Sequence, residues 1–163
     1  MLSIILIFAA SVTIAQEKRW PRFEDYSLKN HYVGQPAPAK INSSRARLFR
    51  TAIRTGAKDG PNFAGHYTII RWGCGSDCRQ FAIVDARTGA VYFPHALTQI
   101  DSGPWVGDEP LAFEETMQFN KRSQLLIAVG RRYVGEHDRG VGKYYYVWRN
   151  NRLKLIASIR RNY

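Results

Sequence analysis

The chain has 163 residues, of which 45% are hydrophobic and 13% are aromatic. This composition excludes an intrinsically disordered chain and fits one domain with its own hydrophobic core. The formal net charge of +11 favours anionic partners such as lipopolysaccharide phosphates, teichoic acids or acidic proteins. A basic face that only keeps the protein in solution would explain the same charge.

Residues 1–15 have the pattern of a secretory signal peptide. An unbroken apolar run, LSIILIFAA, precedes Thr13 and Ala15, small residues at positions minus three and minus one of a cleavage site before Gln16. The run is too short for a transmembrane helix, and the alternative is a buried N-terminal strand. We therefore expect a signal peptide over residues 1–15, a single α+β domain over residues 16–163, and a periplasmic or secreted bacterial protein. Export argues against nucleic acid as a partner.

The next segments predict an extended arm and one helix. Residues 17–41 contain three prolines and mixed polarity, which is typical of an arm that runs over the surface. Residues 43–58 predict a helix that Ser43 or Ser44 can cap. Its apolar face is expected to contain Leu48, Phe49, Ala52 and Ile53.

Two groups of basic residues are candidate anion-binding sites. On the predicted helix, four basic side chains fall within about a quarter-turn of one another, and no acid in the helix offsets them. These four are Arg47, Arg50, Arg54 and Lys58. Residues 121–163 contain eleven Lys or Arg against two acids, a net charge of +9, and the candidates there are Arg131, Arg132 and Lys143. Ordinary solvent-facing charge is the alternative for both groups.

From Phe63 onward the pattern is that of strands joined by turns. Strands are predicted over residues 63–72, 79–85, 90–94, 123–134, 143–149 and 152–159. We expect an α+β fold in which a mostly antiparallel sheet of about five to seven strands packs against the helix near residues 43–58. In 143–149, Tyr144, Tyr146 and Trp148 alternate with Tyr145 and Val147, so one set belongs to the core. If the other face is open, it forms an aromatic and basic strip for a glycan or an acidic partner.

Cys74 and Cys78 lie in a glycine-rich turn and favour a disulfide, because an exported protein meets an oxidising compartment. Closing a ring of five residues stabilises by only about 2 kcal/mol, so the bond's role is to hold this loop locally. Three alternatives are a zinc site, a redox-active disulfide, and a nucleophilic cysteine with His66 as base and Asp77 or Asp85 as orienting group. The alternative interpretation of His66 is an ordinary packed histidine. We expect no cofactor and no metal.

The central segment resembles an uncharacterised family of small exported bacterial proteins. The shared pattern is Asn-Phe-Ala-Gly-His-Tyr, then Trp-Gly-Cys-Gly and a second Cys, then an Asp-x-x-Thr-Gly turn. In this chain it falls on Asn62–Tyr67, Trp72–Gly75, Cys78 and Asp85–Gly89. The resemblance implies export and one intact domain, and it carries no catalytic residue to this chain.

The function favoured by these observations is a non-catalytic binding protein of the cell envelope, whose partner is an anionic envelope component or an acidic protein. One alternative is an inhibitor or immunity-type protein. Another is a small hydrolase that uses His66 near the Cys74–Cys78 loop. The sequence contains no Gly-x-Ser-x-Gly, His-Glu-x-x-His or phosphate-loop motif, so an enzyme is the less favoured class.

Overall fold

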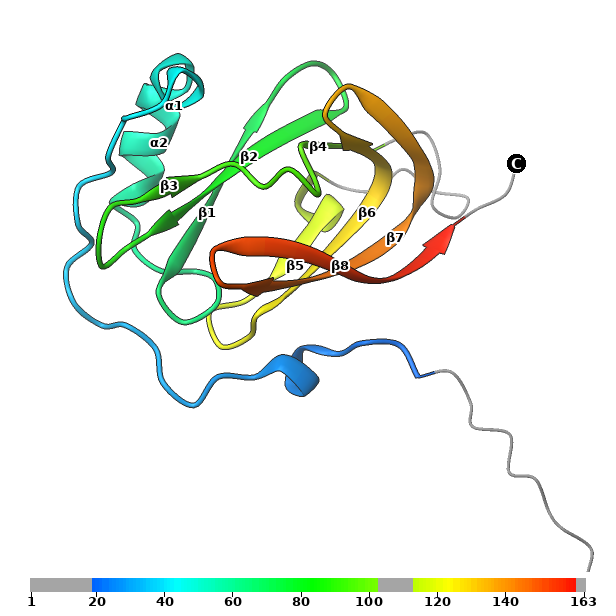
Figure 1. Ribbon diagram of the computed structural model, residues 1–163, viewed down its shortest axis with the longest axis horizontal. Helices are drawn as coiled ribbons and strands as arrows, with labels where there is room; N and C mark the ends of the chain where they lie inside the picture. Colours follow the sequence, from blue (N-terminus) through cyan, green and yellow to red (C-terminus); the bar gives the residue numbers. More distant parts are fainter. Residues whose placement is uncertain (1–18, 103–112, 161–163) are drawn as a thin grey trace, which may run out of the picture.

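The computed structural model of the protein describes residues 19–102 and 113–160 (Figure 1). The expected signal peptide lies outside these residues. Within them, no helix combines the length and the apolar character that crossing a membrane requires.

The described residues form one antiparallel sheet with two short helices, so the expected α+β class is confirmed. The strands are β1 (Tyr67–Gly73), β2 (Cys78–Asp85), β3 (Val91–Tyr92), β4 (Gln99–Asp101), β5 (Met117–Phe119), β6 (Leu125–Val134), β7 (His137–Arg149) and β8 (Arg152–Arg160). The helices are α1 (Ser44–Leu48) and α2 (Arg50–Ala57), with 3-10 turns η1 (Phe23–Tyr26) and η2 (Phe113–Thr116). The described sheet has eight strands instead of five to seven, because β4 and β5 were not predicted. Each of them has only three residues, too few to show a period-two pattern.

The expected single helix is divided at Phe49, whose φ of −107° and ψ of 19° depart from helical values. Ser43 caps α1, and its side-chain oxygen accepts a hydrogen bond from the backbone N–H of Ala46 at 3.1 Å. The residues that pack on the sheet follow helical spacing and are Ala46, Phe49, Ile53 and Ala57. The expected burial of Leu48 is wrong, because it lies about 100° around the helix from Phe49. Its side chain is 78% exposed.

The sheet curls around a central core, and its outer side is covered at two places (Figure 1). The strand order is β1-β2-β4-β6-β7-β8, so the short β4 joins the β1–β2 pair to the three long C-terminal strands. The central core lies between these two parts and includes Phe63, Ile83, Leu126, Tyr146 and Trp148. On the outer side, α1 and α2 cover β1 and β2, whereas the N-terminal arm covers β6 and β7.

The N-terminal arm closes the second face of β7. The two sets of side chains lie on opposite faces, as the alternation predicts: Tyr144, Tyr146 and Trp148 face the central core, and the other face carries Tyr145 and Val147. Trp20 of the arm stacks on Tyr145 with ring centroids 5.9 Å apart, and Tyr145 is only 3% exposed. The arm therefore occupies the aromatic strip that the sequence offered as an open binding face.

Candidate functional site

His66 lies immediately before β1 and contacts two charged residues of the turn after β2. Its Nε2 atom is 2.9 Å from a terminal nitrogen of Arg87 and 3.9 Å from a carboxylate oxygen of Asp85. Burial is the main cause that lowers the pKa of His66 below 6.5, the Arg87 charge adds to it, and Asp85 opposes it. His66 is therefore neutral at physiological pH and accepts a hydrogen bond from Arg87.

These contacts build the turn after β2. A carboxylate oxygen of Asp85 accepts the backbone N–H of Arg87 at 2.8 Å, and the Asp85 carbonyl accepts that of Gly89 at 2.8 Å. The carbonyl of His66 accepts the N–H of Ala86 at 2.8 Å. Gly89 has a φ of +74°, and a Cβ added there would lie 2.1 Å from the carbonyl oxygen of Pro38 in the arm. The turn therefore locks the arm, the start of β1 and the end of β2 together.

Three further residues of the segment Asn62–Tyr67 have similar structural roles. The Asn62 side chain accepts from the backbone N–H of Ile69 at 2.7 Å and donates to its carbonyl at 3.0 Å. Ala64 and Gly65 take φ values of 43° and 83°, and the N–H of Gly65 bonds to the carbonyl of Lys121 at 2.7 Å. These contacts hold the backbone at the start of β1 against the segment before β6.

The disulfide Cys74–Cys78 is present and closes the turn between β1 and β2, with a Cα–Cα distance of 5.1 Å. His66 lies at the opposite end of β1, so its separation from the disulfide is about 25 Å at the usual rise per strand residue. Both sulfurs are bonded to each other, which leaves no thiolate for His66 or for zinc. Asp77 lies within this loop, where its carbonyl accepts the backbone N–H of Ser102 at 2.8 Å. The structure thus brings His66 and Asp85 together and separates them from Asp77 and the cysteines.

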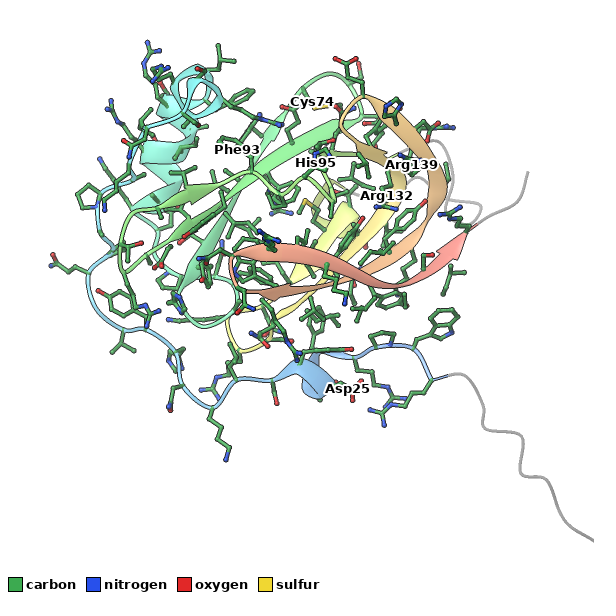
Figure 2. All side chains as sticks on the ribbon, viewed as in Figure 1. Asp25, Cys74, Phe93, His95, Arg132 and Arg139 are labelled. Atoms are coloured by element: carbon green, nitrogen blue, oxygen red, sulfur yellow. A yellow bond between two sulfur atoms is a disulfide. The ribbon has the colours of Figure 1, made fainter. Side chains whose placement is uncertain are left out.

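The three C-terminal basic candidates contact other residues of the protein. Arg131 pairs with Asp138, and the Lys143 amine lies 5.7 Å from the centre of the Tyr145 ring. Arg132 is only 8% exposed, and Figure 2 shows it inside the curve of the sheet. It donates to the carbonyl of Ala96 at 3.0 Å. Arg132 therefore does not lie on the surface with the other candidates, because β6 turns this side chain inward.

The four candidates on and next to the helices, Arg47, Arg50, Arg54 and Lys58, in contrast, all face solvent. Across the described ranges none of them is paired with an acid, and neither α1 nor α2 contains one. Arg54 and Lys58 also line a hollow of about 390 Å³, whose other wall is residues 36–39 of the arm. We refer to Arg47, Arg50, Arg54 and Lys58 together as the basic helix face.

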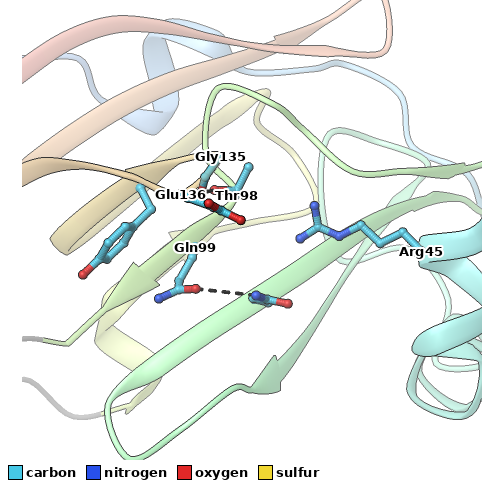
Figure 3. A pocket seen from close by; sticks show the side chains of 7 residues that line it. Arg45, Thr98, Gln99, Gly135 and Glu136 are labelled. Carbon is cyan, nitrogen blue, oxygen red and sulfur yellow. Dashed lines mark hydrogen bonds between the residues drawn. The ribbon is translucent and has the colours of Figure 1, made fainter.

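A second hollow lies over the junction of β2, β4 and β6 and was not predicted. This polar cleft has a volume of about 420 Å³ and is lined by Arg45, Gln80, Thr98, Gln99, Tyr133, Gly135 and Glu136. Figure 3 shows Arg45 extending from the helix on one side, with Glu136 and Thr98 on the other side and Gln99 below them. No local pattern could have found these residues, because the three-residue β4 is what brings them together.

Comparison with family models, curated proteins and solved structures finds no match for this chain. Among the described residues, no three histidine, cysteine, aspartate or glutamate side chains are grouped as metal ligands. The case for function therefore depends on the basic helix face and the polar cleft. The other candidate residues already form contacts within the protein.

Proposed function

We propose that the protein is an exported, non-catalytic binding protein of the bacterial cell envelope, which docks on an anionic, phosphate-bearing surface through the basic helix face. The observation that carries this proposal is the group of four exposed cations without a single acidic partner in the described chain. Repulsion between them costs a few tenths of a kcal/mol per neighbouring pair in the free protein. An anionic surface relieves that repulsion and adds attraction.

The shape of this face supports a surface ligand more than a small buried one. The cations lie along the outer side of α1 and α2, and Leu48, next to Arg47 in the sequence, is 78% exposed. Basic side chains beside an exposed apolar residue suit a lipid headgroup layer, where the cations meet phosphates and the apolar group enters the interface. The engaged state of His66 and Asp85, and the closed disulfide, support a role without catalysis.

The proposal is tested by sedimentation with vesicles of phosphatidylglycerol mixed with phosphatidylcholine, using phosphatidylcholine alone as the neutral surface. Each cation near an anionic surface contributes about 1 kcal/mol at low salt. Changing all four residues of the basic helix face to glutamine is therefore expected to lower partitioning by up to about a thousandfold. Binding should also weaken between low and high salt, because the screening length falls from about 10 Å at 0.1 M to about 3 Å at 1 M.

A matched variant separates docking from general charge. Four exposed arginines elsewhere in the chain can be changed to glutamine together, namely Arg122, Arg139, Arg149 and Arg152. Both quadruple variants lower the formal net charge from +11 to +7, so an effect of total charge would be equal in the two. Equal losses, or equal binding to neutral vesicles, would contradict docking through the helix face.

The proposed export has its own test. Expression of the full chain in a bacterium, followed by intact mass measurement of the protein in the periplasmic fraction, should give a chain that begins at Gln16. Recovery of the uncleaved chain from the cytoplasm would refute export and leave the vesicle result to be judged separately.

A further inference from the structure

The polar cleft between Arg45 and Glu136 has the lining of a small-ligand site. Its volume of about 420 Å³ lies within the range of pockets that hold small molecules. The floor is a row of side chains from three neighbouring strands, since Gln80 and Gln99 hydrogen-bond across β2 and β4 at 3.5 Å, and Gln99 is paired with Tyr133 across β4 and β6.

The floor is held in place by its own hydrogen bonds. The Gln99 amide donates to a carboxylate oxygen of Asp101 at 2.8 Å, and this bond fixes which end of the amide faces Gln80. Gln80 donates to Gln99 through its amide nitrogen, which leaves its carbonyl oxygen available to accept a hydrogen bond from a ligand. At the rim, Thr98 donates to the carbonyl of Gly135 at 2.9 Å, which holds the turn that carries Glu136. The cleft is therefore formed by bonded strands and a braced turn.

The two charges of the cleft are on opposite walls and are not paired. Arg45 lies over the ring of Phe93 at 4.9 Å, which directs its side chain along the cleft (Figure 3). In the part of the chain that the structure describes, neither Arg45 nor Glu136 forms an ion pair, with the other or with a third residue. A ligand that bridges them needs an anionic group for Arg45 and a cationic group for Glu136.

We propose that this cleft binds a short peptide with free ends, or a similar small zwitterion. Arg45 takes the carboxylate, for which its planar guanidinium is suited. Glu136 takes the ammonium group at the other end. The amides of Gln80 and Gln99 lie between them and complement the N–H and carbonyl of a peptide bond. This site uses none of the residues of the basic helix face, so failure of envelope docking would not refute ligand binding in the cleft.

The test is calorimetric titration of the mature protein with L-alanyl-L-alanine, its N-acetyl form and its C-terminal amide. The free dipeptide should bind, and each capped form should bind about tenfold more weakly, because each loses one charge-assisted contact. Arg45→Gln should weaken the free and N-acetyl forms but leave the amide unchanged. Glu136→Gln should weaken the free and amide forms but leave the N-acetyl form unchanged.

Arg47→Gln is the matched control, because Arg47 is on the same short helix but faces solvent and donates to Ser44 instead of the cleft. It should leave all three affinities unchanged. The proposal is overturned if the free dipeptide does not bind, if capping either end has no effect, or if Arg47→Gln weakens binding as much as Arg45→Gln does.

Discussion

Arg132 provides a sharp test of the packing, because it is a buried cation without an acidic partner. Its residue is 8% exposed, and in the described chain it forms no ion pair with a carboxylate. Its guanidinium lies 5.3 Å from the ring centre of Tyr144 and 5.7 Å from that of Tyr146, and it donates to the carbonyl of Ala96. The chain thus holds this charge with aromatic faces and one carbonyl.

The free energy gained from these contacts nearly equals the free energy lost when the charge is removed from water. A hydrogen bond from a charged donor contributes about 1.5–3 kcal/mol, and desolvated cation–π contacts add about 2 kcal/mol. Desolvation of the guanidinium costs several kcal/mol in the opposite direction. We therefore expect Arg132→Met, which keeps most of the volume, to leave the free energy of unfolding within about 1 kcal/mol of the parent or to raise it. Arg132→Ala should lower it by about 2–4 kcal/mol, because it opens a cavity in the core.

Urea unfolding followed by tryptophan fluorescence measures both variants, with an unchanged dependence on urea as the check that two-state unfolding is retained. A loss of more than about 3 kcal/mol in Arg132→Met would refute the reasoning. Such a loss would mean that the charge itself is required, and hence that an anion compensates it in solution.

Three further predictions concern the turns. Because the pKa of His66 is lowered in the folded state, stability is full above pH 6.5 and falls as the pH drops from 6.5 through the lowered pKa. His66→Gln should reduce this fall of the melting temperature at acidic pH. An unchanged fall would contradict the lowered pKa of His66. Replacing Cys74 and Cys78 together by alanine should cost about 2 kcal/mol in urea unfolding, as expected for a five-residue ring, and leave vesicle binding intact. Gly89→Ala should lower the melting temperature more than Gly135→Ala, since both have positive φ but only the first meets a backbone oxygen of the arm; equal losses would show that the contact with the arm is unimportant.

Local chemistry in the sequence was enough to predict much of the scaffold. The alternation in β7 identified the two sets of side chains, because successive residues of a strand point to opposite faces. The strands predicted over residues 143–149 and 152–159 leave Asn150 and Asn151 as the turn, where they take φ values of 50° and 57°, a conformation that asparagine tolerates. Ser43 caps the helix, and the cysteine spacing allowed the disulfide. Each of these features depends on residues that are close together in the chain.

Only the tertiary structure decided which polar side chains meet. Arg131 and Arg132 are adjacent and equally basic, yet one faces outward to Asp138 and the other lies under two tyrosines, because the direction of β6 in the curled sheet determines which face is core. The polar cleft depends on β4, whose three residues join two halves of the sheet and place Gln99 between Gln80 and Tyr133. Pairing between distant segments is selected by burial of the whole apolar surface, and no short window of sequence contains that information.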